Sequence, residues 1–120
     1  MIEITNINTS SKQRLLLEGA NREIITLDLE YRPTQESWYF SLQYQDFVLN
    51  NKKIVNSPNL LRQYKNILPF GLNCVVLDGT DPYFIYDFEN RRCVLNLLDK
   101  DEVELIESEL FWKSSVEYLD

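Results

Sequence analysis

Histidine is absent from the 120-residue chain, which removes the commonest general base, the usual nucleophile pairs and the usual zinc ligand. With three glycines in all, a glycine-rich phosphate loop is hard to build, and neither a GxSxG elbow nor a CxxC pair occurs. No apolar run approaches the roughly 20 residues of a membrane helix, and the start MIEITNINTS lacks the features of a secretory signal. We therefore expect a cytoplasmic protein that is not an enzyme, with no cofactor and no metal.

The chain also has few cysteines. Cys74 and Cys93 stand within apolar strand patterns, where a thiolate is disfavoured, and we expect both to be free, buried thiols. What the chain does have is 44% hydrophobic residues, including seven Tyr, six Phe and two Trp. This composition and length predict one folded domain around one core.

The net charge of −7 is unevenly distributed. Residues 1–98 carry eleven acidic and ten basic residues, whereas residues 99–120 carry eight acidic and two basic ones. The closest approach to a basic patch is Lys52, Lys53, Arg91 and Arg92, too few cations for a nucleic-acid binder. The acidic segment is interpreted either as a solvated face or as a docking element for a basic partner. In the second case, an alternative is that the protein is an inhibitor or nucleic-acid mimic that acts through residues 99–120.

Strand patterns cover most of the chain. Residues 22–31 and 37–44 alternate apolar and polar side chains, and residues 14–18 and 47–55 read as neighbouring strands. Residues 73–77, 83–88 and 91–98 complete the strand set. The expected fold class is mainly β (α+β), an antiparallel β-sandwich or barrel-like meander. Its predicted core face is Ile25, Leu27, Leu29, Trp38, Phe40 and Leu42.

Two helices interrupt this pattern. Asn56-Ser57-Pro58 resembles a capped helix start, followed by Leu60, Leu61 and later apolar residues at helical spacing, which predicts a short helix near 58–66. Asp99 and Glu102 form a predicted capping box for a C-terminal helix near 100–112. Asp78-Gly79 predicts a tight turn.

We divide the chain into an N-terminal arm (1–12), a β domain (13–98) and an acidic C-terminal helix and tail (99–120). Large apolar side chains at both ends lie outside the segments expected to build a self-sufficient core, and such side chains need a surface to cover them. We expect residues 1–8 and 110–120 to order on partner binding, through Ile2, Ile4, Phe111, Trp112, Tyr118 and Leu119.

One carboxylate cluster offers an alternative. Asp78, Asp81 and Asp87 in DGTDPYFIYDF could hold a hard cation or act as an acid and base, which would make the chain a carboxylate-based hydrolase or metal-binding domain. The simpler interpretation gives each carboxylate a local role: a turn with Gly79, a turn before Pro82, and hydrogen bonds to a loop. We prefer the structural interpretation.

An ordered series of turns and caps resembles a known family. The series runs through Asn59-Leu60-Leu61-Arg62-Gln63-Tyr64, Pro69-Phe70-Gly71-Leu72, Asp78-Gly79, Asp81-Pro82, Asp87-Phe88 and Arg92. Over about residues 13–98 the chain resembles the small plug proteins of contractile-tailed phage baseplates.

The resemblance implies a structural virion protein of the tail baseplate, assembled in the host cytoplasm. Its implied partners are other baseplate and tail proteins: the hub or spike, the tail tube and the end of the tape-measure protein. It would join or seal the start of the tail tube by protein–protein contacts, in several copies around the tail axis. No nucleic acid or membrane is implied.

Overall fold

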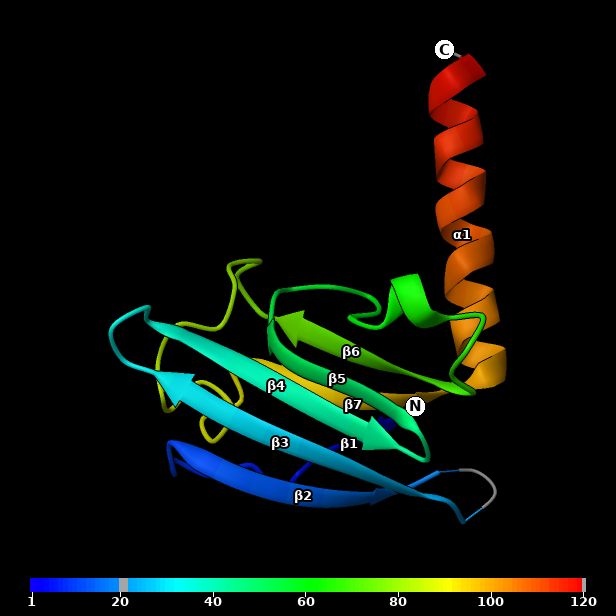
Figure 1. The fold of residues 1–120 in the computed structure, drawn as a ribbon. Helices are drawn as coiled ribbons and strands as arrows, with labels where there is room; N and C mark the ends of the chain where they lie inside the picture. The colour runs from blue at the N-terminus through cyan, green and yellow to red at the C-terminus, as the bar shows by residue number, and fades with distance from the viewer. Residues whose placement is uncertain (20–21, 120) are drawn as a thin grey trace.

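The computed structural model describes residues 1–19 and 22–119, with the side chains of the C-terminal helix described as far as Glu109. This part of the chain contains seven strands, one 3-10 helix and one α-helix (Figure 1). Their bounds in chain order are β1 Ile2–Glu3, β2 Lys12–Glu18, β3 Ile24–Arg32, β4 Ser37–Tyr44, β5 Phe47–Lys53, η1 Arg62–Tyr64, β6 Phe70–Val76, β7 Cys93–Asp99 and α1 Lys100–Leu119.

Two antiparallel sheets form a sandwich. The larger sheet is a meander in the order β2-β3-β4-β5, and the smaller has the order β1-β7-β6. Period-two alternation over β3 and β4 explains the larger sheet, because one face of each strand is apolar. The mainly β, sandwich-like fold expected from the sequence is confirmed.

The core lies between the two sheets. The six residues predicted for its first face are all buried, each with 3% exposure or less, and Trp38 and Leu27 are fully covered. The smaller sheet contributes residues such as Leu72, Cys74 and Leu95 from the other side. Trp38 packs edge-on against Phe88, with 5.4 Å between ring centroids. The predicted core face is therefore correct.

The short helix predicted near 58–66 is present, but it is a 3-10 helix and covers only part of that range. Only Arg62–Tyr64 forms a 3-10 turn, because the preceding residues run along the outer edge of β6. Ser57 forms a β-bridge with Cys74, and the N–H of Leu60 donates to the carbonyl of Leu72 at 2.7 Å. Backbone pairing with a strand therefore takes precedence over the helical pattern of side chains.

The predicted strand at 83–88 is also wrong, because this segment folds into turns. The Asp87 carboxylate accepts the N–H groups of Tyr83 and Phe84, both at 2.8 Å, which curls the chain back on itself. The carbonyl of Phe84 accepts the indole N–H of Trp38 at 3.0 Å. Contacts with distant residues therefore override the alternating pattern.

The C-terminal helix begins where predicted and is longer than the predicted 100–112, since α1 extends to Leu119. No proline or glycine occurs after Lys100 to end it. The helix rises from one end of the sandwich, and its axis points away from both sheets (Figure 1).

Candidate assembly surface

Strand β1 and the start of α1 meet at one end of the sandwich. Strand β1 pairs antiparallel with β7, so that Ile2 lies opposite Leu97. The ammonium group of Met1 forms an ion pair with the carboxylate of Glu102 in the first turn of α1. The N-terminus therefore lies beside the base of the helix (Figure 1).

A capping box fixes the start of α1. The N–H of Glu102 donates to Oδ1 of Asp99 at 2.8 Å, and the N–H of Asp99 donates to Oε1 of Glu102 at 3.1 Å. Each side chain thus satisfies the backbone donor of the other residue, as the sequence predicted. Because Asp99 is the last residue of β7, the box sets the direction in which the helix leaves the sheet.

The base of the helix also packs closely on β6. Val103 is 5% exposed and lies over Gly71, where an added Cβ would come within 2.8 Å of both the Val103 Cγ2 and the Asn59 Oδ1. That same Oδ1 accepts the N–H groups of Leu61 and Leu72, at 3.0 and 3.1 Å. Glycine is needed here because there is no space for a side chain.

Glu107 ties the next turn of the helix to the 3-10 segment. Its carboxylate accepts hydrogen bonds from Arg62 Nε at 2.8 Å and from Lys65 Nζ at 2.9 Å. Burial opposes ionisation of Glu107, but the hydrogen bonds from Lys65 and Arg62 outweigh it and hold its pKa below the usual value. This acidic residue therefore contributes to the fold rather than to a free acidic face.

A hollow of about 190 Å³ opens between the sheets at this end. Met1 and Ile2, which line it, are 62% and 65% exposed. The other lining residues are Glu18, Gly19, Glu23, Ile25, Tyr44, Pro69, Phe70, Leu97, Leu98, Asp99 and Glu102. We call this end of the sandwich, with Met1, Ile2 and the exposed side of α1, the helix end.

The structure separates the residues predicted to bind partners. Ile2 lies exposed at the helix end, where the prediction for it stays open. The expectation that Ile4 lies outside the core is wrong: it is 9% exposed, belongs to the core cluster, and its N–H bonds to the carbonyl of Leu95 at 2.9 Å. Ile7 is buried as well. The side chains of Phe111, Trp112, Tyr118 and Leu119 lie outside the described residues.

The three candidate catalytic carboxylates lie in the loops at the opposite end of the sandwich from α1. Asp87 is fully buried, and Arg92 binds it through Nε at 2.9 Å and through a second nitrogen at 2.7 Å. Arg92 also bonds Oδ1 of Asp78 at 2.8 Å. Asp81 accepts the N–H of Asn56 at 2.9 Å. Each carboxylate therefore stabilises a turn or a loop.

The electrostatics of this group agree with that role. Burial opposes ionisation of Asp87, but the ion pair with Arg92 and the N–H groups of Phe84 and Tyr83 hold its pKa below the usual value. Hydrogen bonds from Thr80 lower the pKa of Asp78. Among the described residues, no group of three or more His, Cys, Asp or Glu side chains could hold a metal ion.

The two thiols are free and buried, as expected. Cys74 lies opposite Leu95 and Cys93 opposite Val76 in the β6–β7 ladder, which places both in the core. Burial raises the pKa of each thiol to about 12. Both groups therefore stay protonated at neutral pH and behave as small apolar side chains.

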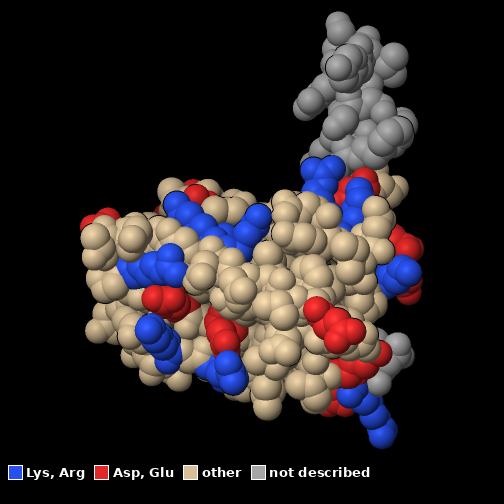
Figure 2. Space-filling model, in the orientation of Figure 1, with Lys and Arg blue, Asp and Glu red and all other residues tan. Residues whose placement is uncertain are grey.

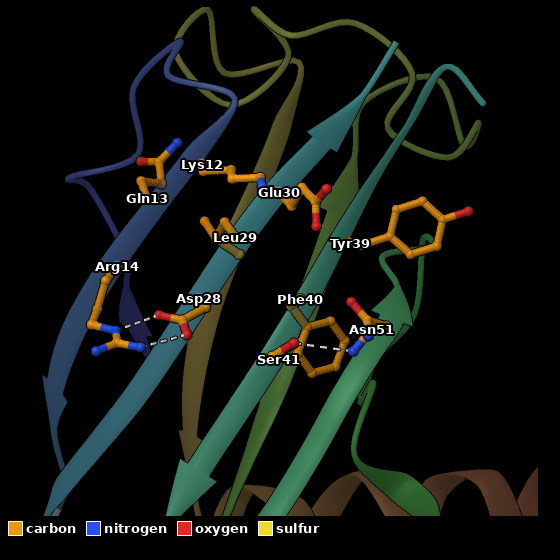
Figure 3. Close-up of a pocket in the computed structure, with 10 residues that line it drawn as sticks. All are labelled: Lys12, Gln13, Arg14, Asp28, Leu29, Glu30, Tyr39, Phe40, Ser41 and Asn51. Atoms are coloured by element: carbon orange, nitrogen blue, oxygen red, sulfur yellow. Dashed lines mark hydrogen bonds and ion pairs between the residues drawn. The ribbon is translucent and has the colours of Figure 1, made fainter. Parts of the chain in front are cut away.

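The outer face of the larger sheet contains an open hollow of about 420 Å³ (Figure 3). Two contacts join residues that line it: Arg14 binds Asp28 at 2.7 and 3.0 Å, and the backbone N–H of Asn51 donates to the Ser41 hydroxyl at 3.0 Å. Acidic and basic side chains are interspersed over the viewed face of the molecule (Figure 2). This hollow presents no strong charge of one sign.

Three exposed aliphatic side chains on this face were not identified from the sequence. Leu16, Ile24 and Val48 are 67%, 58% and 55% exposed. The signal was present for Leu16, because alternation in β2 must place it on the face opposite Leu15 and Leu17. Ile24 and Val48 follow from the same rule once the register is known.

Within the part of the chain that the structure describes, no helix has both the length and the hydropathy needed to cross a bilayer.

These features describe a small β-sandwich whose three candidate carboxylates and two cysteines serve the fold, and one end of which is formed by the N-terminus and the base of α1. A family model described as "Cyanophage baseplate Pam3 plug gp18" matches residues 1–105, and no curated protein matches the chain. The chain therefore belongs to this family of baseplate plug proteins, whose members are structural components of the phage tail baseplate. The match covers the N-terminal arm as well as the β domain, and it ends inside α1.

Proposed function

We propose that this chain lies on the tail axis of the virion, where it joins or seals the start of the tail tube through protein–protein contacts. The observation that carries the proposal is the match to the plug family over residues 1–105. The proposed neighbours are the central hub or spike, the first tube ring and the end of the tape-measure protein. Several copies would surround the axis, after assembly in the host cytoplasm.

The helix end is the surface we assign to these contacts. It presents exposed Met1 and Ile2 beside a hollow, and it is the end from which α1 extends (Figure 1). Covering an aliphatic side chain of this size contributes about 1.5–3 kcal/mol before ordering costs. A few such contacts are enough to decide an assembly step. We extend the assignment to Phe111, Trp112, Tyr118 and Leu119, as the sequence predicted.

Catalysis forms no part of the proposal. Asp87 is fully covered and neutralised by Arg92, so it is available neither as a nucleophile nor as a ligand. Removing divalent cations with a chelator should leave the melting temperature unchanged. A fall of several degrees would restore the metal-binding alternative.

The test is co-expression with candidate hub and tail-tube proteins, followed by native mass measurement of the complexes. Three variants are compared: Ile2→Asp, deletion of residues 110–120, and Leu77→Asp as the matched control. Leu77 is 82% exposed and follows β6 at the opposite end of the sandwich. The first two variants should fold normally but assemble poorly. The control should both fold and assemble normally. Normal assembly of both helix-end variants would refute the assignment of this surface.

A further inference from the structure

Strand β2 is a regular and open sheet edge. It pairs on one side with β3, in unbroken register from Lys12 opposite Glu30 to Glu18 opposite Ile24, and no other described strand pairs with its other side (Figure 1). It carries three consecutive leucines, of which Leu16 is 67% exposed and Leu15 and Leu17 are partly buried. Edge strands of this kind attract pairing with another chain.

The backbone groups that face outward can be assigned. The N–H of Gly19 donates to the carbonyl of Glu23 at 2.8 Å, and the N–H of Tyr31 donates to the carbonyl of Ser11 at 2.8 Å. In an antiparallel ladder, hydrogen-bonded pairs alternate with non-bonded ones, so the odd-numbered residues of β2 bond to β3. The N–H and C=O groups of Arg14, Leu16 and Glu18 therefore point to the open side. Within the described chain, no backbone bond from outside the ladder reaches them.

The other sheet edges are shielded. Segment 57–60 covers the edge of β6, and β1 spans only Ile2–Glu3. In β5, the register against β4 shifts between Phe40 and Leu42, and Asn51 has a φ of 56°, both of which distort the edge. Strand β2 has no bulge, no proline and no inward-facing charge. Of the features that keep edges from pairing, it has only exposed charged side chains, at Lys12, Arg14 and Glu18.

We propose that two copies of this chain pair through β2, antiparallel, with Leu16 opposite Leu16 of the second copy on a two-fold axis. In this register Arg14 of one copy faces Glu18 of the other, so opposite charges meet on both sides of the axis. Leu15 faces Leu17 on the core side of the sheet. Every leucine lies opposite a leucine, and the residues with free backbone groups face one another, as the ladder requires. The two four-stranded sheets become one continuous sheet.

Charge distinguishes self-pairing of β2 about Leu16 from other registers and from pairing with β5. Moving the axis one residue toward the N-terminus of β2, to Leu15, places Arg14 opposite Leu16. A further step to Arg14 places two arginines face to face, which is unfavourable. Pairing β2 with β5 of a second copy, leucines against Phe47, Val48 and Leu49, sets Glu18 against Asp46 and Lys12 against Lys52. Self-pairing of β2 about Leu16 is the arrangement in which both charge and apolar side chains match.

The experiment measures the mass of the whole chain by sedimentation equilibrium or light scattering from about 1 to 200 µM. We expect a concentration-dependent species of twice the 14.3 kDa chain mass, with a dissociation constant on the order of micromolar, because the contact is small. Leu16→Lys sets two ammonium groups opposite each other and should raise that constant at least tenfold. Val48→Lys makes the same change on the other edge strand and should leave it unchanged. Both sites are exposed, so circular dichroism and the melting temperature should report an intact fold.

Two charge variants test the register. Glu18→Lys opposes Arg14 with a cation and Arg14→Glu opposes Glu18 with an anion, so each variant alone should be monomeric. Mixed together they should form a heterodimer, since both pairs become attractive. A chain that stays monomeric throughout the concentration range would overturn the proposal, as would a dimer insensitive to Leu16→Lys. Dissociation by Val48→Lys instead would assign the contact to β5, and a dimer insensitive to both charge variants would overturn the register.

Discussion

A methyl group added at Gly71 tests how helix α1 is attached to the body. The Cβ of Gly71→Ala would lie 2.8 Å from Oδ1 of Asn59 and 2.8 Å from Cγ2 of Val103. Non-bonded carbon atoms are comfortable at about 3.5–4.0 Å, so something must move by several tenths of an ångström. The neighbours that must move are a buried amide and a buried aliphatic side chain, and neither is the free end of a flexible group.

The cost can be worked out from these contacts. Overpacking in a core costs about 1–3 kcal/mol. If the side-chain carbonyl of Asn59 moves away, the N–H groups of Leu61 and Leu72 lose their acceptor. A buried donor left unpaired costs about 1–3 kcal/mol. We expect Gly71→Ala to lower the free energy of unfolding by about 2–4 kcal/mol, since partial relaxation prevents the full sum.

Urea unfolding followed by circular dichroism measures this loss, and Gly19→Ala is the matched control. A Cβ at Gly19 would meet only the Glu23 carbonyl at 3.6 Å and the Ile25 Cδ1 at 3.8 Å, which are ordinary contacts. The control should change stability by about 0.5 kcal/mol or less. The double variant Gly71→Ala/Val103→Ala should lose less stability than the sum of the losses in the two single variants. The second change removes one of the atoms with which the added Cβ clashes. A loss at Gly71 no larger than at Gly19 would refute the reasoning.

Three further predictions concern the core and the loops at the far end. Asp87→Asn should cost about 3–5 kcal/mol at pH 7, because it leaves the Arg92 charge without its buried partner. The native pKa of Asp87 is lowered, so its stabilisation is present above the unfolded pKa of about 3.9 and is lost as the pH falls through the native value. The free energy of unfolding should therefore fall less steeply with acidification in the variant than in the parent chain. An unchanged dependence on pH would contradict this. Trp38→Ala should cost about 3–5 kcal/mol, and an unchanged melting temperature would remove Trp38 from the core. Cys74 and Cys93, with pKa values raised to about 12, should react with a thiol reagent only in urea, and rapid labelling of the native protein would show that they are accessible.

The parts of this fold that the sequence predicted depend on neighbours close along the chain. Alternation in residues 22–31 and 37–44 identified the buried face, and the spacing of Asp99 and Glu102 identified the start of α1. Asp78-Gly79 formed its tight turn, in which Gly79 has a φ of 79°. Each of these patterns involves only a few residues that are close in sequence, so the sequence alone is sufficient to predict the structure there.

The parts that could not be predicted depend on distant partners. Residues 83–88 alternate like a strand, but the segment folds into turns around the Asp87 carboxylate. The ion pair of Asp87 with Arg92 forms only in the folded loop. Segment 57–60 has a helix signal, but β6 offers it backbone partners. Ile4 was not predicted as a core residue because the strand that it contacts, β7, lies far from it along the chain. A pattern read locally cannot detect such pairings.

For the candidate site, the sequence identified the N-terminal and C-terminal segments but not the contact between the N-terminus and the base of α1. The resemblance noted from the sequence covered about residues 13–98, whereas the family model matches residues 1–105. The additional residues are those of the arm and of the base of α1, and the first residue of the arm, Met1, lies beside Glu102 of the helix. This contact depends on the pairing of β1 with β7, which no local sequence pattern predicts.

The attachment of α1 divides the helix into two parts with different expected roles. Glu102, Val103 and Glu107 tie its first two turns to the N-terminus, to β6 and to the 3-10 segment. The family match ends at residue 105, close to the last of these ties. Substitutions in the tied part should therefore change stability, because they alter contacts within the shared fold. Substitutions beyond Glu109 should instead change assembly, if the second part of the helix serves the partners proposed for this chain.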